Sequence, residues 1–207
     1  MAHLSDKANQ LREKYYNKYG MPPRGWSHGE ETMNEYENFL ENEINKSNIK
    51  VLFVCLGNIC RSPMAEFIFK DMIYKKDLTS DFIIKSAATS YEEIGNDMHY
   101  GAKDKLNQKN IPFSKRKACI ITPKDYEYYD FIIGMEESNI RNIKRIVGKD
   151  IKNKISRLLD YSDNPRDIAD PWYTGNFETA YNDIVEGCIG FLNYLEGMSI
   201  LYEKEKN

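Results

Sequence analysis

Residues 49–63 read IKVLFVCLGNICRSP, and this stretch decides the fold. Residues 51–56 are a continuous run of apolar residues, which is typical of a buried strand. The second half contains Gly57, which allows close backbone approach, and Asn58, which tolerates a left-handed backbone. Pro63 suits the first position of a helix. The stretch therefore predicts a buried strand, a tight loop and a helix, in that order.

A loop that joins a strand to a helix in this way can bind a phosphoryl group. Its amide N–H groups can turn inward, and the helix N-terminus adds about half a positive charge. A dianionic phosphoryl group fits such a concave, positive surface. We expect the cradle to be formed by Leu56, Gly57, Asn58, Ile59, Cys60 and Arg61.

Three side chains of this loop carry the chemistry. Cys55 lies at the mouth of the cradle, where the positive surroundings stabilise its thiolate, which is the nucleophilic form. Arg61 would place a planar guanidinium across two phosphoryl oxygens. The hydroxyl of Ser62 can donate a hydrogen bond to the Cys55 sulfur. The loop therefore predicts attack of Cys55 on phosphorus.

The rest of the chain alternates between short apolar runs and helical patterns, which predicts a parallel sheet with helices on both faces. The further strand-like runs are FIIKS, ACIIT, DFIIGM and KISRLL, at residues 82–86, 118–122, 130–135 and 154–159. The helical patterns cover residues 63–74, 100–108, 136–147 and 178–195. A loop rich in Pro, Gly, Asp and Asn, residues 163–176, separates the strand-like run 154–159 from the last helical pattern, 178–195.

Residues 1–48 differ in kind from the rest. They contain no strand pattern, and two helical stretches flank the breaker segment GMPPRGWSHG. The first stretch is mainly basic and the second mainly acidic, so the two should attract each other in an antiparallel helical hairpin. We expect this extension to dock on the remaining domain, residues 49–207; the alternatives are a partner-binding arm and a loosely ordered tail.

Composition excludes several function classes. The net charge of -3 argues against nucleic-acid binding, and the longest apolar run is too short to span a bilayer. The four cysteines form neither a dense disulfide framework nor the paired spacing of a zinc site. Reduced thiols and a cytoplasmic location are therefore expected. His3, His28 and His99 lie far apart and beside no ligand cluster, so neither a metal nor a cofactor is expected.

The segment VCLGNICRSPMAE, residues 54–66, resembles the signature of low-molecular-weight protein tyrosine phosphatases. The similarity runs from about residue 50 to residue 195, and SAATS, EIGN, MEESN and DPW follow in the family's order, from residues 86, 93, 135 and 170. The resemblance implies a phosphatase I-like fold with a four-stranded parallel sheet. It also implies hydrolysis of protein phosphotyrosine through a cysteinyl-phosphate, with inorganic phosphate as product and phosphotyrosine-containing proteins as partners.

Displacement of a phenolate or alkoxide by a thiolate needs a positioned acid to protonate the leaving group. By chemistry alone, Asp160, Asp163, Asp167 and Asp170 are all candidates. The resemblance selects Asp170, because Pro171 follows it as in the family's Asp-Pro pair. Asp170 is therefore expected to be the general acid.

The walls of the substrate pocket are also expected from the sequence. Trp172 and Tyr173 follow the acid directly and can sandwich an aromatic ring. Ile59 would form an apolar floor beside the leaving group. The resemblance places a variable wall residue at Tyr91 or Glu92.

Two supporting features come from the resemblance. Ser86 matches a serine that hydrogen-bonds the loop asparagine, here Asn58. Related sequences often add a histidine to this network, whereas this chain has Arg116 and Cys119 at the matching places. Cys60 lies on the same loop as Cys55, and two roles stay open for it: it traps an oxidised Cys55 as a reversible disulfide, or it only packs.

Three alternatives to phosphotyrosine hydrolysis remain open. Protein arginine phosphatases tend to carry threonine where this chain has Ile59. Arsenate reductases of similar fold need closely paired additional cysteines, whereas Cys119 and Cys188 are far apart in the sequence. A phosphotyrosine-binding module without turnover would fill the same cradle but release no phosphate.

Overall fold

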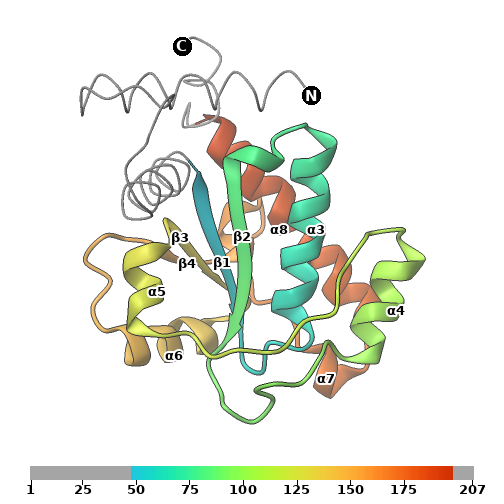
Figure 1. The fold of residues 1–207 in the computed structure, drawn as a ribbon, viewed down its shortest axis with the longest axis horizontal. Coiled ribbons are helices and arrows are strands. Elements are labelled where there is room, and N and C mark those ends of the chain that lie inside the picture. Colours follow the sequence, from blue (N-terminus) through green and yellow to red (C-terminus); the bar gives the residue numbers. More distant parts are fainter. Residues whose placement is uncertain (1–47, 198–207) are drawn as a thin grey trace, which may run out of the picture. The chain divides into compact units, whose positions relative to one another are not determined.

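The computed structural model describes residues 48–197, which contain a parallel sheet with helices on both faces (Figure 1). The four strands are β1 (Ile49–Cys55), β2 (Phe82–Ala88), β3 (Phe131–Gly134) and β4 (Ile155–Arg157). Their order is β2-β1-β3-β4, and every neighbouring pair is parallel. The predicted fold class is confirmed for these residues. The helical hairpin predicted for residues 1–48 lies outside the described residues, which begin at Asn48.

The helices that follow the strands are α3 (Arg61–Lys75), α4 (Tyr100–Gln108), α5 (Pro123–Tyr128), α6 (Glu137–Val147), α7 (Pro171–Thr174) and α8 (Phe177–Gly197), with 3-10 turns η1 (Thr79–Asp81) and η2 (Leu158–Tyr161). Four of the helices, α3, α4, α6 and α8, match the helical patterns of the sequence, whereas α5 and α7 were not predicted. Within residues 48–197, no helix has the length and apolar character needed to cross a membrane.

Helix α5 was not predicted, although the sequence carries a signal for it. The carboxylate of Asp125 accepts hydrogen bonds from the backbone N–H of Thr122, at 2.6 Å, and from its hydroxyl, at 2.7 Å. Pro123 occupies the first helical turn. A Thr-Pro-x-Asp segment is therefore a helix start here, because the carboxylate satisfies groups that the helix itself leaves unpaired.

The side chains of β1 alternate between two cores on opposite faces of the sheet. Val51 and Phe53 belong to the core that α3 and α8 cover, whereas Leu52 and Val54 belong to the core beside α5 and α6 (Figure 1). A strand buried on both faces lies in the middle of the sheet. From β1 the chain adds β2 on one side of the sheet and then β3 on the other, so the order of strand addition reverses beside β1. In sheets of this kind, ligands bind where the order reverses, outside the carboxyl ends of the strands. Cys55 ends β1 at that position.

The apolar run of residues 118–122 is not a fifth strand, so that prediction was wrong. Ile120 forms a single isolated bridge with Ala88 at the end of β2. Ala88 donates to the carbonyl of Cys119 at 2.7 Å and accepts from the N–H of Ile121 at 2.9 Å. The helix start at Pro123 follows at once and ends the extended pairing. This short contact carries the chain past the end of β2, next to the nucleophile loop.

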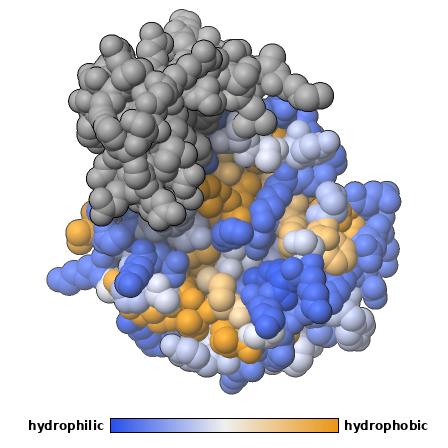
Figure 2. All heavy atoms as spheres, in the orientation of Figure 1, coloured by the Kyte–Doolittle hydropathy of each residue, from blue (hydrophilic) through white to orange (hydrophobic). Residues whose placement is uncertain are grey.

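The outward faces of the helices are largely polar. Figure 2 shows hydrophilic residues over much of the face in view, with smaller apolar areas between them. In α6, for example, Ile140 and Ile143 are buried while Arg141 and Lys144 are exposed. Amphipathic helices of this kind cover a sheet with one face and meet water with the other.

Candidate active site

The loop between β1 and α3 lies where the phosphate cradle was predicted. Asn58 adopts a left-handed backbone, with φ of 57°, which turns the chain back on itself. Helix α3 begins at Arg61; its N-cap residue, Cys60, makes no side-chain capping hydrogen bond, and the first turn contains no acidic residue. The first N–H groups of α3 and its positive end are therefore not neutralised by a carboxylate of the same turn, as an anion-binding helix start requires.

The sulfur of Cys55 lies within this loop and is 3.1 Å from Ser62 Oγ. The backbone N–H of Asn58 also donates to the sulfur, at 3.3 Å. The side-chain amide of Asn58 donates to Ser62 Oγ at 2.8 Å, so the hydroxyl hydrogen of Ser62 can point at the sulfur or at the carbonyl of Ala87, which is 3.4 Å away. The predicted contact between Ser62 and Cys55 is thus present. The N–H of Asn58 donates to the sulfur, and the hydroxyl of Ser62 is close enough to do so as well.

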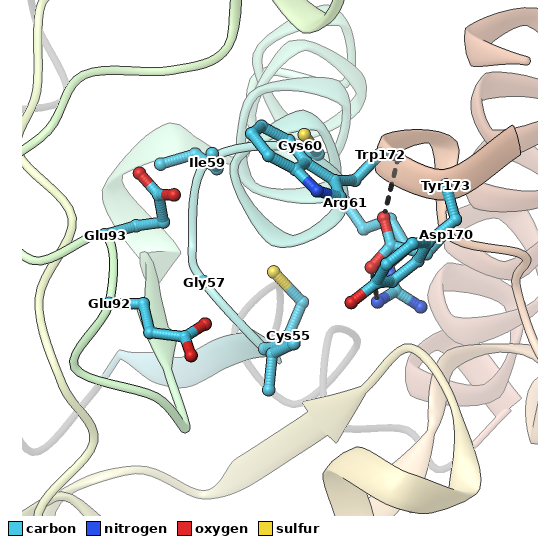
Figure 3. Close-up of a pocket in the computed structure, with 11 residues that line it drawn as sticks. Cys55, Gly57, Ile59, Cys60, Arg61, Glu92, Glu93, Asp170, Trp172 and Tyr173 are labelled. Carbon is cyan, nitrogen blue, oxygen red and sulfur yellow. Dashed lines mark hydrogen bonds and ion pairs between the residues drawn. The ribbon is translucent and has the colours of Figure 1, made fainter. Parts of the chain in front are cut away.

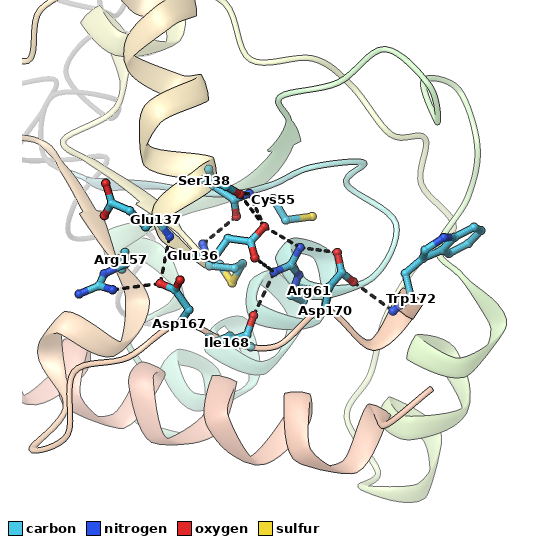
Figure 4. Close-up of polar contacts among 12 residues, drawn as sticks. Cys55, Arg61, Glu136, Glu137, Ser138, Arg157, Asp167, Ile168, Asp170 and Trp172 are labelled. Atoms are coloured by element: carbon cyan, nitrogen blue, oxygen red, sulfur yellow. Dashed lines mark hydrogen bonds and ion pairs between the residues drawn. The ribbon is translucent and has the colours of Figure 1, made fainter. Parts of the chain in front are cut away.

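Arg61 is almost completely buried, with a side-chain exposure of 1%. Its Nη1 donates to the carbonyl of Ile168 at 3.0 Å, and it forms ion pairs with Glu136 and Asp170 (Figure 4). Burial alone would lower the pKa of Arg61, but the charge of Cys55 and the hydrogen bond with Glu136 raise it above its usual value. Its Nε has no hydrogen-bond partner among the described residues. The guanidinium is therefore fixed on one side, and its buried Nε keeps a hydrogen that no described group accepts.

Glu136 is a residue next to Arg61 that sequence analysis did not single out. Its carboxylate contacts Arg61 at 3.1 Å and accepts hydrogen bonds from Ser138 at 2.8 Å and Asn139 at 3.2 Å (Figure 4). Burial would raise the pKa of Glu136, but the hydrogen bond and charge of Arg61 outweigh it and lower the pKa. Glu136 therefore stays ionised and orients Arg61. Glu136 belongs to the MEESN segment that the resemblance includes, but the sequence did not show its contact with Arg61, which lies 75 residues away.

Asp170 lies at the start of α7 and reaches Arg61. One carboxylate oxygen accepts the backbone N–H of Trp172 at 3.1 Å and so caps α7. The other forms an ion pair with Arg61 Nη2 (Figure 4). Its side chain is 16% exposed, so a substrate can reach it. This short helix within the predicted loop places a carboxyl group next to the cradle.

The rival aspartates are occupied elsewhere or exposed. Asp160 and Asp167 both form ion pairs with Arg157, at 2.8 Å and 2.9 Å. Asp163 is exposed to solvent. None of these three aspartates lines the pocket around Cys55. The geometry therefore favours Asp170 as the acid.

A cavity of about 100 Å³ opens above the sulfur of Cys55 (Figure 3). It is lined by Cys55, Leu56, Gly57, Ile59, Cys60, Arg61, Glu92, Glu93, Asp170, Trp172 and Tyr173. Ile59, Glu92, Trp172 and Tyr173 thus lie where substrate walls were expected. Of the two alternatives for the variable wall, the structure selects Glu92 and not Tyr91, which does not line the cavity and is 77% exposed. Tyr91 begins a turn, with its carbonyl accepting the N–H of Ile94, that brings the next two residues to the pocket.

The network behind the cradle is built differently from the expected one. Arg116 donates to the carbonyl of Asn58 at 2.7 Å, to its side-chain oxygen, and to Ser86 Oγ at 3.2 Å. Ser86 itself donates to Glu66 at 2.5 Å, so the predicted direct bond from Ser86 to Asn58 was wrong. The backbone N–H of Cys119 also donates to the Asn58 side-chain oxygen, at 3.3 Å. Arg116 thereby takes the place between Ser86 and Asn58 and holds the left-handed residue of the loop.

His99, to which sequence analysis assigned no role, connects the cradle to the aromatic wall. The backbone N–H of His99 donates to the carbonyl of Ile59 at 2.9 Å. The ring Nδ1 accepts the backbone N–H of Gly101 at 3.1 Å and so caps α4. Its ring meets Trp172 edge-on, with centroids 5.5 Å apart, and stacks on Phe177 at 5.3 Å. The other two histidines lie outside the described residues. His99 thus packs against Trp172 and links it to the nucleophile loop.

Cys60 packs beside Ile59 and Ala118, and its thiol is free. Burial, and then the charges of Cys55 and Asp170, raise the pKa of Cys60 to about 12. Near neutral pH Cys60 is therefore a neutral thiol, and peroxide should oxidise Cys55 first. Condensation of the Cys55 sulfenic acid with the Cys60 thiol would release water and form a disulfide.

We expect peroxide-inactivated protein to regain most of its activity with dithiothreitol, and the Cys60→Ser variant to regain clearly less, because its Cys55 has no thiol to trap it before further oxidation. Intact mass should show the wild-type protein losing two hydrogens on oxidation. Equal recovery of the variant and the wild type would show that Cys60 only packs.

Comparison with known proteins gives consistent results. The family model of the low molecular weight phosphotyrosine protein phosphatase matches residues 50–200. The low molecular weight protein-tyrosine-phosphatase YfkJ of Bacillus subtilis is 42% identical over 142 residues, which cover 68% of this chain and 91% of that protein. PtpA of Staphylococcus saprophyticus is 37% identical, over 71% of this chain and 94% of its own length.

Solved structures agree with the fold. The crystal structure of YfkJ superposes with a TM-score of 0.70 at 40% identity and covers 78% of this chain and 98% of its own. A Drosophila arginine phosphatase superposes with a TM-score of 0.64 at 30% identity, over 70% of this chain and 97% of its own. Sequence, fold and cradle lead to one conclusion: the chain belongs to the low molecular weight phosphotyrosine protein phosphatase family.

Proposed function

We propose that the protein hydrolyses protein phosphotyrosine through a cysteinyl-phosphate intermediate. Cys55 is the nucleophile, Arg61 the phosphate clamp and Asp170 the general acid and then the general base. The observation that carries this proposal is that these three side chains line one cavity, although Asp170 lies far from the other two in the sequence. Thiolate chemistry also fits the reducing, cytoplasmic setting expected from the cysteines.

In the first step the Cys55 thiolate attacks phosphorus while the phosphoryl oxygens are held by cradle amides and by Arg61 Nε. Asp170 gives its proton to the departing phenolate oxygen. Negative charge on the equatorial oxygens faces the guanidinium and the positive end of α3, so electrostatic stabilisation is preorganised where the charge resides. The hydrogen bond between Ser62 and the sulfur helps Cys55 to leave later.

In the second step a water molecule attacks the cysteinyl-phosphate, and the Asp170 carboxylate accepts its proton. The P–S bond breaks, the sulfur leaves as a thiolate beside Ser62 and the N–H of Asn58, and inorganic phosphate is released. One carboxyl group serves both steps because it returns to its starting protonation state. No metal or cofactor takes part in this proposal.

Phosphotyrosine is favoured over phosphoarginine by the walls of the cavity. Ile59 offers no hydrogen-bond acceptor to a guanidinium. Glu92 and Glu93 do offer acceptors, but they line the side of the cavity opposite Asp170, away from the leaving group. Trp172 and Tyr173 lie on the side of the cavity where Asp170 would meet the leaving group (Figure 3). Aromatic faces there suit a tyrosyl ring.

The test compares kcat/KM for phosphotyrosyl and phosphoarginyl forms of one peptide, with a chelator present. We expect the wild-type protein to prefer phosphotyrosine by about tenfold or more. Ile59→Thr should lower this ratio, since threonine keeps the β-branch but adds a hydroxyl that can bind the guanidinium. A wild-type preference for phosphoarginine would overturn the substrate assignment, and absence of hydrolysis of both would overturn the function.

A further inference from the structure

The rim of the active-site cavity is acidic on the side opposite Asp170. Glu92 and Glu93 line this side, while Asp170, Trp172 and Tyr173 line the other, with the sulfur of Cys55 between them (Figure 3). Sequence analysis expected a wall at Glu92 but assigned no role to its charge. Two carboxylates at the mouth of a phosphate site repel a dianionic phosphoryl group, so their presence there needs a reason.

Glu93 is held close to the cradle. A Cβ added to Gly57 would lie 3.1 Å from Glu93 Cγ, so the Glu93 stem packs directly over the loop. Its carboxylate accepts a hydrogen bond from the side chain of Asn96 at 2.8 Å. The charge of Glu93 also contributes to raising the pKa of Cys60. Glu93 is thus a fixed negative charge beside the phosphoryl position.

Glu92 extends the same charge outward. It is exposed, and its carboxylate forms no hydrogen bond or ion pair with any of residues 48–197. Figure 3 shows its carboxylate directed toward the opening above Cys55. This carboxylate is therefore available to a substrate.

The positive charge of the cavity lies only at its floor. Among the described residues, Arg61 is the single Lys or Arg that lines the cavity, and its unpartnered, buried Nε provides the donor for a phosphoryl oxygen. A phosphoryl group that binds at the floor lies below the rim. The peptide residues that flank the phosphotyrosine must then pass over the rim. The floor and the rim therefore recognise opposite charges on one substrate.

We propose that Glu92 and Glu93 select phosphotyrosine sites flanked by basic side chains. This inference rests on the proposed phosphotyrosine phosphatase function and adds the class of sequence around the phosphotyrosine. A lysine or arginine on the peptide reaches the rim carboxylates and offsets their repulsion of the phosphoryl group, whereas a flanking glutamate adds to it.

The size of the effect follows from exposed charge pairs. Each such pair changes affinity only a few-fold in water, because solvent and salt screen it. Two carboxylates that attract lysine and repel glutamate should therefore give roughly a tenfold difference between two such peptides. The difference should appear mainly in KM, since the rim does not contact the reacting atoms.

The experiment measures kcat/KM for two phosphotyrosyl peptides that differ only in carrying lysine or glutamate on both sides of the phosphotyrosine. The full-length protein should prefer the lysine peptide roughly tenfold at low salt, and this ratio should fall toward one in about 0.5 M salt. Glu92→Gln and Glu93→Gln should each lower the ratio by about threefold. Asp104→Asn is the matched control, because Asp104 is exposed on α4 and does not line the cavity, and it should leave the ratio unchanged.

The outcomes separate this inference from the proposed function. If the protein hydrolyses p-nitrophenyl phosphate and has the same kcat/KM for the two peptides, the role of the rim is overturned and the proposed function stands. A ratio that survives both glutamine substitutions would place the selectivity elsewhere and also overturn it. Failure to hydrolyse either phosphotyrosyl peptide or the simple aryl phosphate would overturn both.

Discussion

Replacing Cys55 with serine should lower kcat for phosphotyrosyl peptides and for simple aryl phosphates by at least about 10⁴-fold, since no covalent intermediate can form. The serine hydroxyl can still accept the N–H of Asn58 and meet Ser62, as the sulfur does now at 3.3 Å and 3.1 Å. It is not ionised near neutral pH, however, and it cannot attack phosphorus at a comparable rate. Steady-state kinetics measure the loss.

The same variant should keep its phosphate site. The cradle amides, the N-terminus of α3 and Arg61 are unchanged, so inorganic phosphate should bind Cys55→Ser within about tenfold of the wild-type affinity, as measured by calorimetry. Cys60→Ser is the matched control, because it makes the same atomic change on the same loop and should retain turnover. A Cys55→Ser variant that keeps more than about a hundredth of the wild-type rate would rule out the covalent mechanism.

The nucleophile loop could be predicted because everything it needs is contiguous. Residues 49–63 carry the strand, the turn and the helix start together, and the backbone of Asn58 adopts the left-handed conformation that asparagine tolerates. Ser62 lies only seven residues after Cys55, whose sulfur it contacts. Local sequence therefore determines local geometry here, and tertiary contacts refine it.

The partners of that loop could not be predicted, because they come from distant segments. Glu136 reaches Arg61 across 75 residues and Arg116 reaches Asn58 across 58 residues. A carboxylate or guanidinium in a sequence carries no mark of which buried group it will meet. The resemblance correctly pointed to the segment of Arg116 but not to its bonds, since an arginine reaches farther and donates more hydrogen bonds than the histidine of related sequences.

Turns and edges explain the remaining errors. Tyr91 and Glu93 lie two residues apart in a turn with no period, so the sequence alone does not show which of them faces the cavity. The run at residues 118–122 is as apolar as a strand, yet it pairs with Ala88 through one bridge only. Extended apolar segments form strands only where a neighbouring strand continues beside them.

Replacing Asp170 with alanine should lower kcat for phosphotyrosyl peptides by about two to four orders of magnitude, the usual contribution of a general acid. The loss should shrink for aryl phosphates with strongly acidic phenols, because these leaving groups need little protonation. The fall of kcat at alkaline pH should also disappear, as no carboxylic acid remains to lose its proton. Rates for a series of substituted phenyl phosphates across pH test all three expectations.

Asp170 has two further roles that a control must separate from acid catalysis. It caps α7 through the N–H of Trp172 at 3.1 Å and forms an ion pair with Arg61, so alanine also removes a helix cap worth about 1 kcal/mol. Asp170→Asn keeps an oxygen that can accept the N–H of Trp172 but cannot deliver a carboxyl proton, and it should lose nearly as much activity as alanine. Asp167→Ala removes a carboxylate that binds Arg157 outside the cavity and should stay within about tenfold of wild type. If Asp170→Asn retained activity, or if Asp167→Ala or Asp163→Ala showed the dependence on the leaving group instead, Asp170 would not be the acid.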